Sequence, residues 1–136
     1  MNLTTLEAAF REAFAVFWGK GTIEDFYGFF DERGAFVDED SPFLLDKKLF
    51  QDHVDFHVKG NWDALEWIPR EPRFQVIGRT GIVTCYFTLR GKPRDSGFRL
   101  RHGVCSALCY WDGRQWRGAT LHLDPLLGHI RDASPG

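Results

Sequence analysis

The stretch from Arg99 to Pro125 constrains the fold of this chain more than any other part of the sequence. Two runs of alternating residues predict β-strands, and the Asp112-Gly113 dipeptide between them is typical of the tight turn of a β-hairpin. Each strand carries one histidine, His102 on the first and His122 on the second, on a face whose other residues are mostly small or apolar. Such a histidine is either a core residue hydrogen-bonded to backbone or a group with a chemical role.

Alternation also divides the residues of these two strands between two faces. On the second strand, one face carries Trp116, Gly118, Thr120 and His122, and the other carries Arg117, Ala119, Leu121 and Leu123. On the first strand, His102 shares a face with Leu100, Val104, Ser106 and Leu108.

Helices are predicted ahead of these strands from apolar residues at helical spacing and from capping residues. Their predicted starts and ends are Thr4 and Gly19, Thr22 and Gly34, and Asp46 and Val58. Further strands are predicted at 35–37, 61–77 and 82–89. Pro69 and Pro72 interrupt the second of these, and because proline cannot donate a ladder hydrogen bond we expect a bend or bulge there.

The 136 residues suit one domain, residues 1–136, with a single core. The formal net charge is −2, and the arginines of the second half alternate with core-type residues instead of forming a basic block. This pattern favours a solvated sheet face over a nucleic-acid site. Aromatic residues make up 15% of the chain, which predicts either a very bulky core or a cavity lined with rings.

The three cysteines, Cys85, Cys105 and Cys109, lie in strand-like runs without a CxxC motif. Their odd number and the absence of a signal-peptide pattern indicate reduced core thiols in a cytoplasmic protein. No apolar run approaches the ~20 residues that cross a bilayer, so no membrane partner is expected.

Helices first and long antiparallel strands afterwards indicate an α+β fold. We expect the N-terminal helices to pack on a strongly bent, mostly antiparallel sheet, forming a cone with an internal pocket. The segment Trp116-x5-His122-x-Asp124-Pro125, behind a glycine turn, resembles the closing strand of the nuclear transport factor 2-like superfamily, whose fold is also called cystatin-like. More narrowly, it is similar to the SnoaL-like and ketosteroid isomerase-like branches. The opening helices, the short strand 35–38 and the Gly78 turn match too, so the resemblance covers nearly the whole chain.

The resemblance implies roles for particular residues. In ketosteroid isomerase-like enzymes a carboxylate just after the first short strand is the general base, and an ungapped count from Gly21 places it at Asp38. A small loop insertion would place it at Asp40 instead. The first-helix tyrosine of those isomerases corresponds to Phe14, which cannot donate a hydrogen bond, so the steroid isomerase reaction itself is not expected.

The predicted catalytic group is therefore Asp38 or Asp40, assisted by His102 and His122 through acid–base chemistry. An exposed acidic turn is the alternative interpretation of residues 38–40. The residues expected to bind substrate are Phe14, Trp18, Tyr27, His53, Phe56, Trp67 and Tyr86.

His53 and His57 lie four residues apart on the third predicted helix, so their rings share one face and could share a metal ion. No glutamate stands where a metalloprotease carries its base. We therefore expect one histidine at the rim of the pocket and the other capping or solvated, with no metal and no cofactor.

Two functions follow from this fold. The first is a cofactor-free isomerase, dehydratase or cyclase acting on a small, mainly apolar, ring-containing molecule. The alternative is a non-catalytic ligand-binding or dimerising module, with a homodimer formed through the outer sheet face. The residues expected on that face are Arg99, Arg101, Cys105, Arg117 and Leu121. RNA binding through the arginines is a third hypothesis, which the alternating pattern disfavours.

Overall fold

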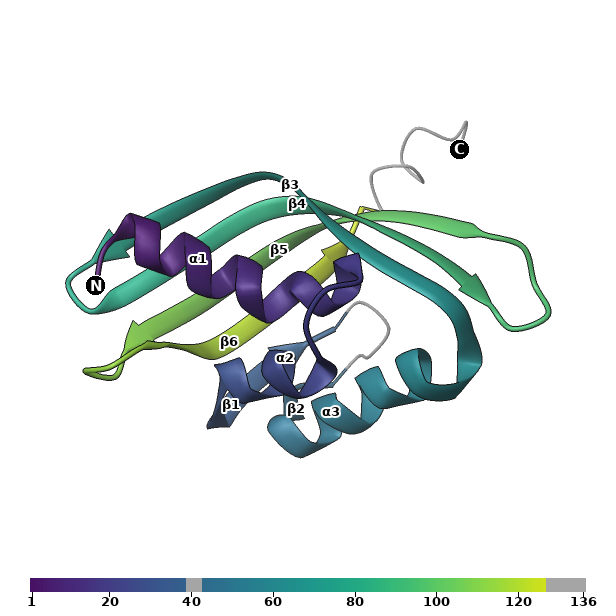
Figure 1. Cartoon of the computed structure of the whole chain (residues 1–136), viewed down its shortest axis with the longest axis horizontal. Helices are drawn as coiled ribbons and strands as arrows, with labels where there is room; N and C mark the ends of the chain where they lie inside the picture. Colours follow the sequence, from purple (N-terminus) through teal and green to yellow (C-terminus); the bar gives the residue numbers. More distant parts are fainter. Residues whose placement is uncertain (39–42, 127–136) are drawn as a thin grey trace.

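Helices pack against one face of a strongly curved six-stranded sheet in the computed structural model (Figure 1). The structure describes residues 1–38 and 43–126. The helical segments are α1 (Leu3–Phe14), the 3₁₀ helix η1 (Ala15–Trp18), α2 (Ile23–Phe29), α3 (Lys47–Phe56) and the π-helical turn η2 (His57–Asn61). The strands are β1 (Phe30–Val37), β2 (Leu45–Asp46), β3 (Trp62–Ile77), β4 (Thr80–Pro93), β5 (Arg99–Trp111) and β6 (Trp116–Pro125).

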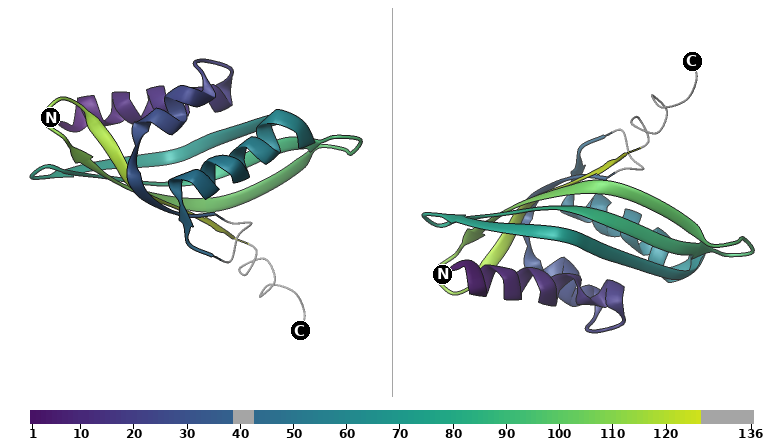
Figure 2. Two further views of the ribbon diagram at one scale, coloured as in Figure 1. Left: turned by 90° about the horizontal axis from the view of Figure 1, so that it is seen from below. Right: turned by 90° about the horizontal axis from the view of Figure 1, so that it is seen from above.

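The sheet is mixed, with the strand order β2-β1-β6-β5-β4-β3. β1 and β6 run parallel, and every other neighbouring pair is antiparallel. Figure 2 shows α1 and α2 on one side of the long strands, and side chains of α1, α2 and α3 line one cavity together with those of β3, β4 and β6. The three helices therefore cover the concave face of the sheet. The expected α+β cone is confirmed. Among the described residues, no helix is both long enough and apolar enough to span a bilayer.

Two of the three helices begin at the capping residue predicted from the sequence, and the first helix begins at a different one. The Thr22 and Asp46 side chains accept hydrogen bonds from the third backbone N–H of α2 and α3, as predicted. The first helix is capped by Asn2 instead of Thr4, because Asn2 and Thr5 exchange side-chain to backbone hydrogen bonds of 2.9 and 3.0 Å. α2 is shorter than predicted, and β1 begins directly after it at Phe30.

The bulge predicted in the proline-interrupted strand is present. The register between β3 and β4 shifts between Arg70 and Arg73, where Glu71 adopts a φ of 50°. The β5–β6 turn contains Gly113 at a φ of 103°, a conformation that glycine adopts without steric cost.

Aromatic rings fill most of the space between the helices and the sheet. The fully buried rings are Phe10, Phe30, Phe36 and Phe87. Burying one such side chain contributes ~1.5–3 kcal/mol to stability, so these rings supply much of the driving force for folding. The three cysteines carry free thiols and are buried, as expected of core residues. Burial raises the pKa of the Cys109 thiol to about 12.

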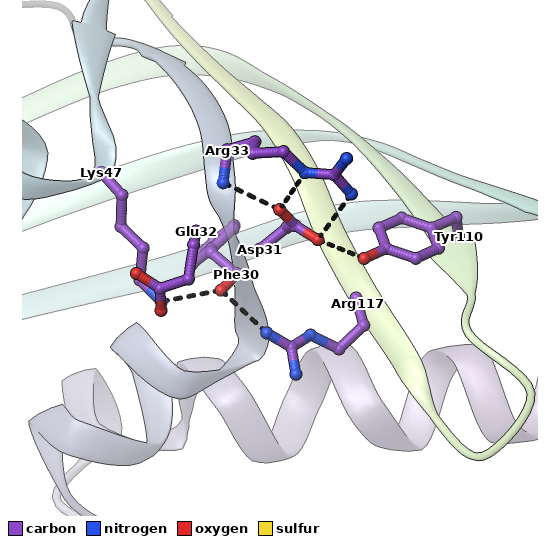
Figure 3. Close-up of polar contacts among 7 residues, drawn as sticks. All are labelled: Phe30, Asp31, Glu32, Arg33, Lys47, Tyr110 and Arg117. Carbon is purple, nitrogen blue, oxygen red and sulfur yellow. Dashed lines mark hydrogen bonds and ion pairs between the residues drawn. The ribbon is translucent and has the colours of Figure 1, made fainter.

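A polar network holds the start of β1 against the centre of the sheet (Figure 3). The Asp31 carboxylate accepts hydrogen bonds from the backbone and Nε of Arg33, at 2.8 and 3.2 Å, and from the Tyr110 hydroxyl of β5. The hydrogen bond from the Arg33 side chain, followed by that from Tyr110, holds the pKa of Asp31 below its ordinary value.

The same end of β1 is tied to two further elements through the Phe30 carbonyl (Figure 3). Lys47 Nζ, at the start of α3, donates to this oxygen at 2.8 Å and to Glu32 Oε1 at 2.8 Å. Arg117 Nη2, from β6, donates to it at 3.3 Å. These contacts fix β1, and hence the residues at its far end, relative to α3 and β6.

Candidate functional site

A cavity of about 90 Å³ lies between the helices and the concave face of the sheet. Its apolar lining consists of Phe14, Phe17, Phe26, Phe50, Val54, Trp62, Leu65, Trp67, Phe87, Leu89, Leu121 and Leu123. Among the described residues, the polar part of the lining consists of Asp38, His53 and His57. A mostly apolar cavity with a few converging polar groups is the composition typical of small-molecule sites.

The polar residues reach the cavity from two elements. β1 ends at Val37, and Asp38 is the next residue along the chain. His53 and His57 lie four residues apart in the helical segment that runs from α3 into η2, which places both rings on one face. Phe50, one turn before His53, is buried in the core and turns this face of α3 toward the cavity.

Asp38 and His53 form a close pair inside the lining. Asp38 Oδ2 lies 2.6 Å from His53 Nε2, and the two side chains are 12% and 23% exposed. A carboxylate and an imidazole at this separation attract each other when the imidazole is protonated, and both are groups that can donate or accept a proton. In the described part of the structure the acid–base groups on the cavity wall are Asp38, His53 and His57, and Asp38 and His53 form the carboxylate–imidazole pair among them.

His57 extends the pair toward the start of β3. Its ring meets that of His53 edge to face, with 4.9 Å between the centroids. Trp62 Nε1 donates to His57 Nδ1 at 2.7 Å. Because an indole nitrogen only donates, Nδ1 of His57 accepts, and the proton of the neutral ring sits on Nε2. Trp62 thus selects the tautomer of His57, a role that no sequence spacing signals.

His53 and His57 carry imidazole groups of the kind that bind metal ions. Within the described residues, no group of three or more His, Cys, Asp or Glu side chains is arranged to hold a metal ion. His53 contacts Asp38, and His57 contacts Trp62.

Known structures with this arrangement of elements belong to one fold. A candidate dehydratase of the NTF2-like family from Streptomyces avermitilis matches with a TM-score of 0.76 and 14% identity, over 91% of this chain and 95% of that one. A candidate scytalone dehydratase from Novosphingobium aromaticivorans matches with a TM-score of 0.75 and 9% identity, over 90% and 82%. The S. rosetta CaMKII hub matches with a TM-score of 0.74 and 15% identity, over 92% and 97%.

The chain has the nuclear transport factor 2-like fold. No protein-family profile and no curated protein sequence matches it, so the likeness lies in the backbone. The neighbours differ in what they are described as doing, since two are candidate dehydratases and one is a kinase hub. The nuclear transport factor 2-like fold therefore does not decide the chemistry, which has to be argued from the cavity.

Four of the predicted site residues line the cavity of this nuclear transport factor 2-like chain: Asp38, Phe14, His53 and Trp67. Asp40, the alternative base, lies outside the described residues. His57 belongs to the lining as well, so the expectation that one histidine of this pair would lie away from the pocket, capping the helix or solvated, is wrong. Trp62 was missed, because its contact with His57 depends on how η2 turns the chain into β3.

The other predicted substrate-binding residues lie elsewhere, each for a local reason. The Trp18 indole donates to the Trp67 carbonyl, and Trp18 is not part of the lining. The Tyr27 hydroxyl donates to Asp55 Oδ1 at 2.6 Å, a contact that joins α2 to α3. Burial, followed by that hydrogen bond, raises the pKa of Tyr27. Phe56 is exposed at the end of α3, and Tyr86 is exposed on the outer face of the sheet.

His122 is exposed on the outer face, and a β-bulge explains why. Leu108 pairs with Thr120 and Cys109 with Gly118, so Ala119 is one residue too many for its partner strand. Trp116 and Gly118 face the core before the bulge. After it the alternation is reversed, Leu121 is buried, and His122 points away from the cavity. The expected convergence of His122 with Asp38 is therefore corrected.

His102 is also on the outer face. Its strand turns Cys105, Ala107 and Cys109 into the core, so the residues of opposite parity face outward. His102 Nδ1 lies 3.1 Å from Thr88 Oγ1 and does not line the cavity. The residue that takes its expected place beside Asp38 is His53.

Proposed function

We propose that this protein binds a small, mainly apolar molecule with a single ring in the cavity and transfers a proton on it without a cofactor, as an isomerase, dehydratase or cyclase does. The observation that carries the proposal is the Asp38–His53 pair, 2.6 Å apart in a cavity whose other walls are almost wholly apolar. General acid–base catalysis of this kind contributes ~10²–10⁴-fold in rate.

The two members of the pair have different roles. Asp38 is the base that takes a proton from a ring carbon next to an electron-withdrawing group. His53 balances the carboxylate charge before the transfer, holds the carboxylate in position and relays the proton to its final site. Water is kept from the reacting atoms by the rings around the pair, which strengthens its electrostatic effect.

The size of the cavity limits the substrate. An engineered protein cavity of ~150 Å³ holds benzene, and the cavity here measures about 90 Å³. One ring fits after small side-chain adjustments, whereas a fused-ring skeleton does not. This agrees with the replacement of the expected tyrosine donor by Phe14, which argues against a steroid substrate.

Trp67 supports a substrate that carries an acceptor oxygen. This residue lines the cavity and is 6% exposed, and its indole nitrogen has no hydrogen-bond partner among the described residues. A buried donor without a partner costs ~1–3 kcal/mol. A carbonyl or hydroxyl oxygen on the substrate would accept this hydrogen bond, which is the electrophilic role that Phe14 cannot fill.

A simple ring ketone tests the proposal. Cyclohexanone has one ring, one acceptor oxygen and C–H groups that a base can deprotonate. In D₂O, removal of one of these protons and return of a deuteron from solvent labels the ketone without altering it otherwise. We expect the protein to accelerate deuterium uptake, measured by mass spectrometry. Uptake no faster than with an equal concentration of the unfolded chain contradicts the proposal.

Trp67→Phe isolates the donor in the same assay. The variant keeps the ring and loses the N–H, and we expect deuterium uptake to slow about tenfold. Trp116→Phe is the matched control, because Trp116 is also buried but its Nε1 donates to Thr5 Oγ1 at 3.0 Å, away from the cavity. Equal rates for the two variants would remove Trp67 from the mechanism.

The outer sheet face supports a second function, self-association. Tyr86 and Leu108 are exposed on it, and Val104 is paired with Tyr86. Cys105 and Leu121, expected on this face, are buried in the core instead. An exposed sheet face with apolar content is suited to covering by a second copy. A neighbour from Exiguobacterium sibiricum, described as a candidate calcium/calmodulin-dependent kinase II association domain, shares the fold with a TM-score of 0.69.

Light scattering after size-exclusion chromatography tells whether the protein is a dimer or a monomer. We expect a dimer mass for the native chain and a monomer mass for Tyr86→Glu. Leu49→Glu, an equally exposed position on α3, serves as the control and should leave the mass unchanged. A native chain that is monomeric at micromolar concentration excludes this second function and leaves the first intact.

A further inference from the structure

A groove of about 370 Å³ adjoins the cavity. We infer that it holds the uncharged polar tail of the molecule whose ring lies in the cavity. The inference rests on the proposed function and names the substrate class more closely. Phe17, Trp62 and Leu65 line both spaces, so the groove adjoins the cavity at these three side chains.

Of the three residues that line both the cavity and the groove, Trp62 is held in place by two contacts. Its indole nitrogen donates to His57 Nδ1, and its ring lies against Gly91 of β4. A Cβ added to Gly91 would come within 2.3 Å of Trp62 Cζ3, so only glycine allows the ring to lie there. A ligand that passes beside this ring meets an aromatic edge already held in place and orders few additional side chains on binding.

The lining of the groove differs from that of the cavity. Beyond the three shared residues, it is made by Val16, Gly21, Thr22, Ile23, Val58, Lys59 and Asp63. Its two charges already have partners, because Lys59 Nζ lies 3.4 Å from Asp55 Oδ1 and Asp63 Oδ2 lies 2.9 Å from Lys92 Nζ. Because each of these charges is already balanced by a neighbour, a charged tail gains little net electrostatic attraction there. A short chain that ends in a hydroxyl or amide needs no such attraction, and it could still form hydrogen bonds there.

The volumes agree with a ring that carries a tail. The groove of about 370 Å³ is roughly four times the size of the cavity of about 90 Å³. A single ring fills the inner space, and the groove has room for several more non-hydrogen atoms. Each buried CH₂ group in a tail adds ~0.8 kcal/mol of hydrophobic free energy. The ligand class is therefore a single-ring amphiphile with its polar group at the end of the tail.

A series of substituted ring ketones tests this inference by calorimetric titration. The probes are cyclohexanone itself and cyclohexanones that carry a propyl, a 3-hydroxypropyl or a 2-carboxyethyl group at the 4-position. We expect the hydroxypropyl ketone to bind at least tenfold more tightly than cyclohexanone and more tightly than the propyl ketone. The affinity gained by the carboxyethyl ketone over cyclohexanone should be smaller than that gained by the propyl or the hydroxypropyl ketone.

Filling the groove supplies the decisive comparison. In Val58→Trp the hydroxypropyl tail should no longer improve the dissociation constant, and Lys59→Trp is a second variant if the first fails to fold. Leu49→Trp, on an exposed part of α3 outside both spaces, should retain the full tail effect.

The outcomes separate this inference from the proposed function. If cyclohexanone is deuterated and binds but no tail improves affinity, the groove is not part of the site. The inference also fails if the tail effect survives in the groove variants, or if the carboxyethyl ketone binds best. If cyclohexanone neither binds nor exchanges, the proposed function fails and the inference fails with it.

Discussion

Two aspartates at opposite ends of β1 are similarly covered by protein but differ in their partners. The Asp31 side chain is 16% exposed and that of Asp38 is 12% exposed. Asp31 accepts hydrogen bonds from a guanidinium, a phenol and a backbone N–H. Asp38 contacts the imidazole of His53 at the wall of an apolar cavity.

The difference shows that burial alone does not make a carboxylate useful for proton transfer. The donors around Asp31 favour its charged form, which is why its pKa lies below the ordinary value. A carboxylate held in that way binds a proton poorly and serves to join strands. Asp38 lies against an imidazole, a group that can donate or accept a proton, at the wall of a cavity that a small molecule could enter.

The largest expected effect is on proton transfer. Asp38→Asn removes the base but keeps the size of the side chain, and we expect deuterium uptake by cyclohexanone to fall ~10²-fold or more. Asp31→Asn is the matched control because it makes the same change at the other end of β1. If the two variants exchange equally fast, the distinction between the two aspartates is wrong.

The second effect is on stability, and here the variant of Asp31 should lose more than the variant of Asp38. Asp31→Asn weakens the hydrogen bonds from Arg33 and Tyr110, and we expect the free energy of unfolding to fall by about 1–2 kcal/mol. Urea titration followed by circular dichroism measures the loss. Asp38→Asn should lose less than this, since its partner His53 is able to become neutral. A larger loss at Asp38 would show that the cavity pair is structural.

A pH series sharpens the assignment of Asp31. Its pKa is lower in the folded chain than the ordinary 3.8, so its contribution to stability is fully present above pH 3.8 and declines as the pH falls below that value. The difference in unfolding free energy between the native chain and Asp31→Asn should therefore be constant near neutral pH and shrink in acid. A difference that stays the same down to pH 2.5 contradicts this account.

The smallest effect is expected on the outer face. His122→Gln changes an exposed side chain on the far side of the sheet from Asp38, and its stability should change by less than ~0.5 kcal/mol. Deuterium uptake should equal that of the native chain. A rate loss comparable to that of Asp38→Asn would place His122 in the mechanism and overturn the assignment of His53.

The sequence alone was sufficient for the fold and for one half of the acid–base pair. Alternation, capping residues and the order of helices before strands predicted the α+β cone, since these patterns depend on local geometry. The end of β1 and the helical spacing of His53 and His57 are local features too. The helical spacing placed two imidazoles on one helix face, and the resemblance to ketosteroid isomerase-like enzymes placed a carboxylate after the first strand.

Tertiary structure decided which imidazole meets Asp38 and which face of the last hairpin is buried. One extra residue at Ala119 reverses the alternation of β6 and turns His122 outward. A bulge depends on how two strands and the rings beneath them pack, and no single strand sequence encodes it. The pairing of Asp38 with His53 depends in the same way on the docking of α3 beside the end of β1, because contacts between distant segments are set by packing and not by spacing.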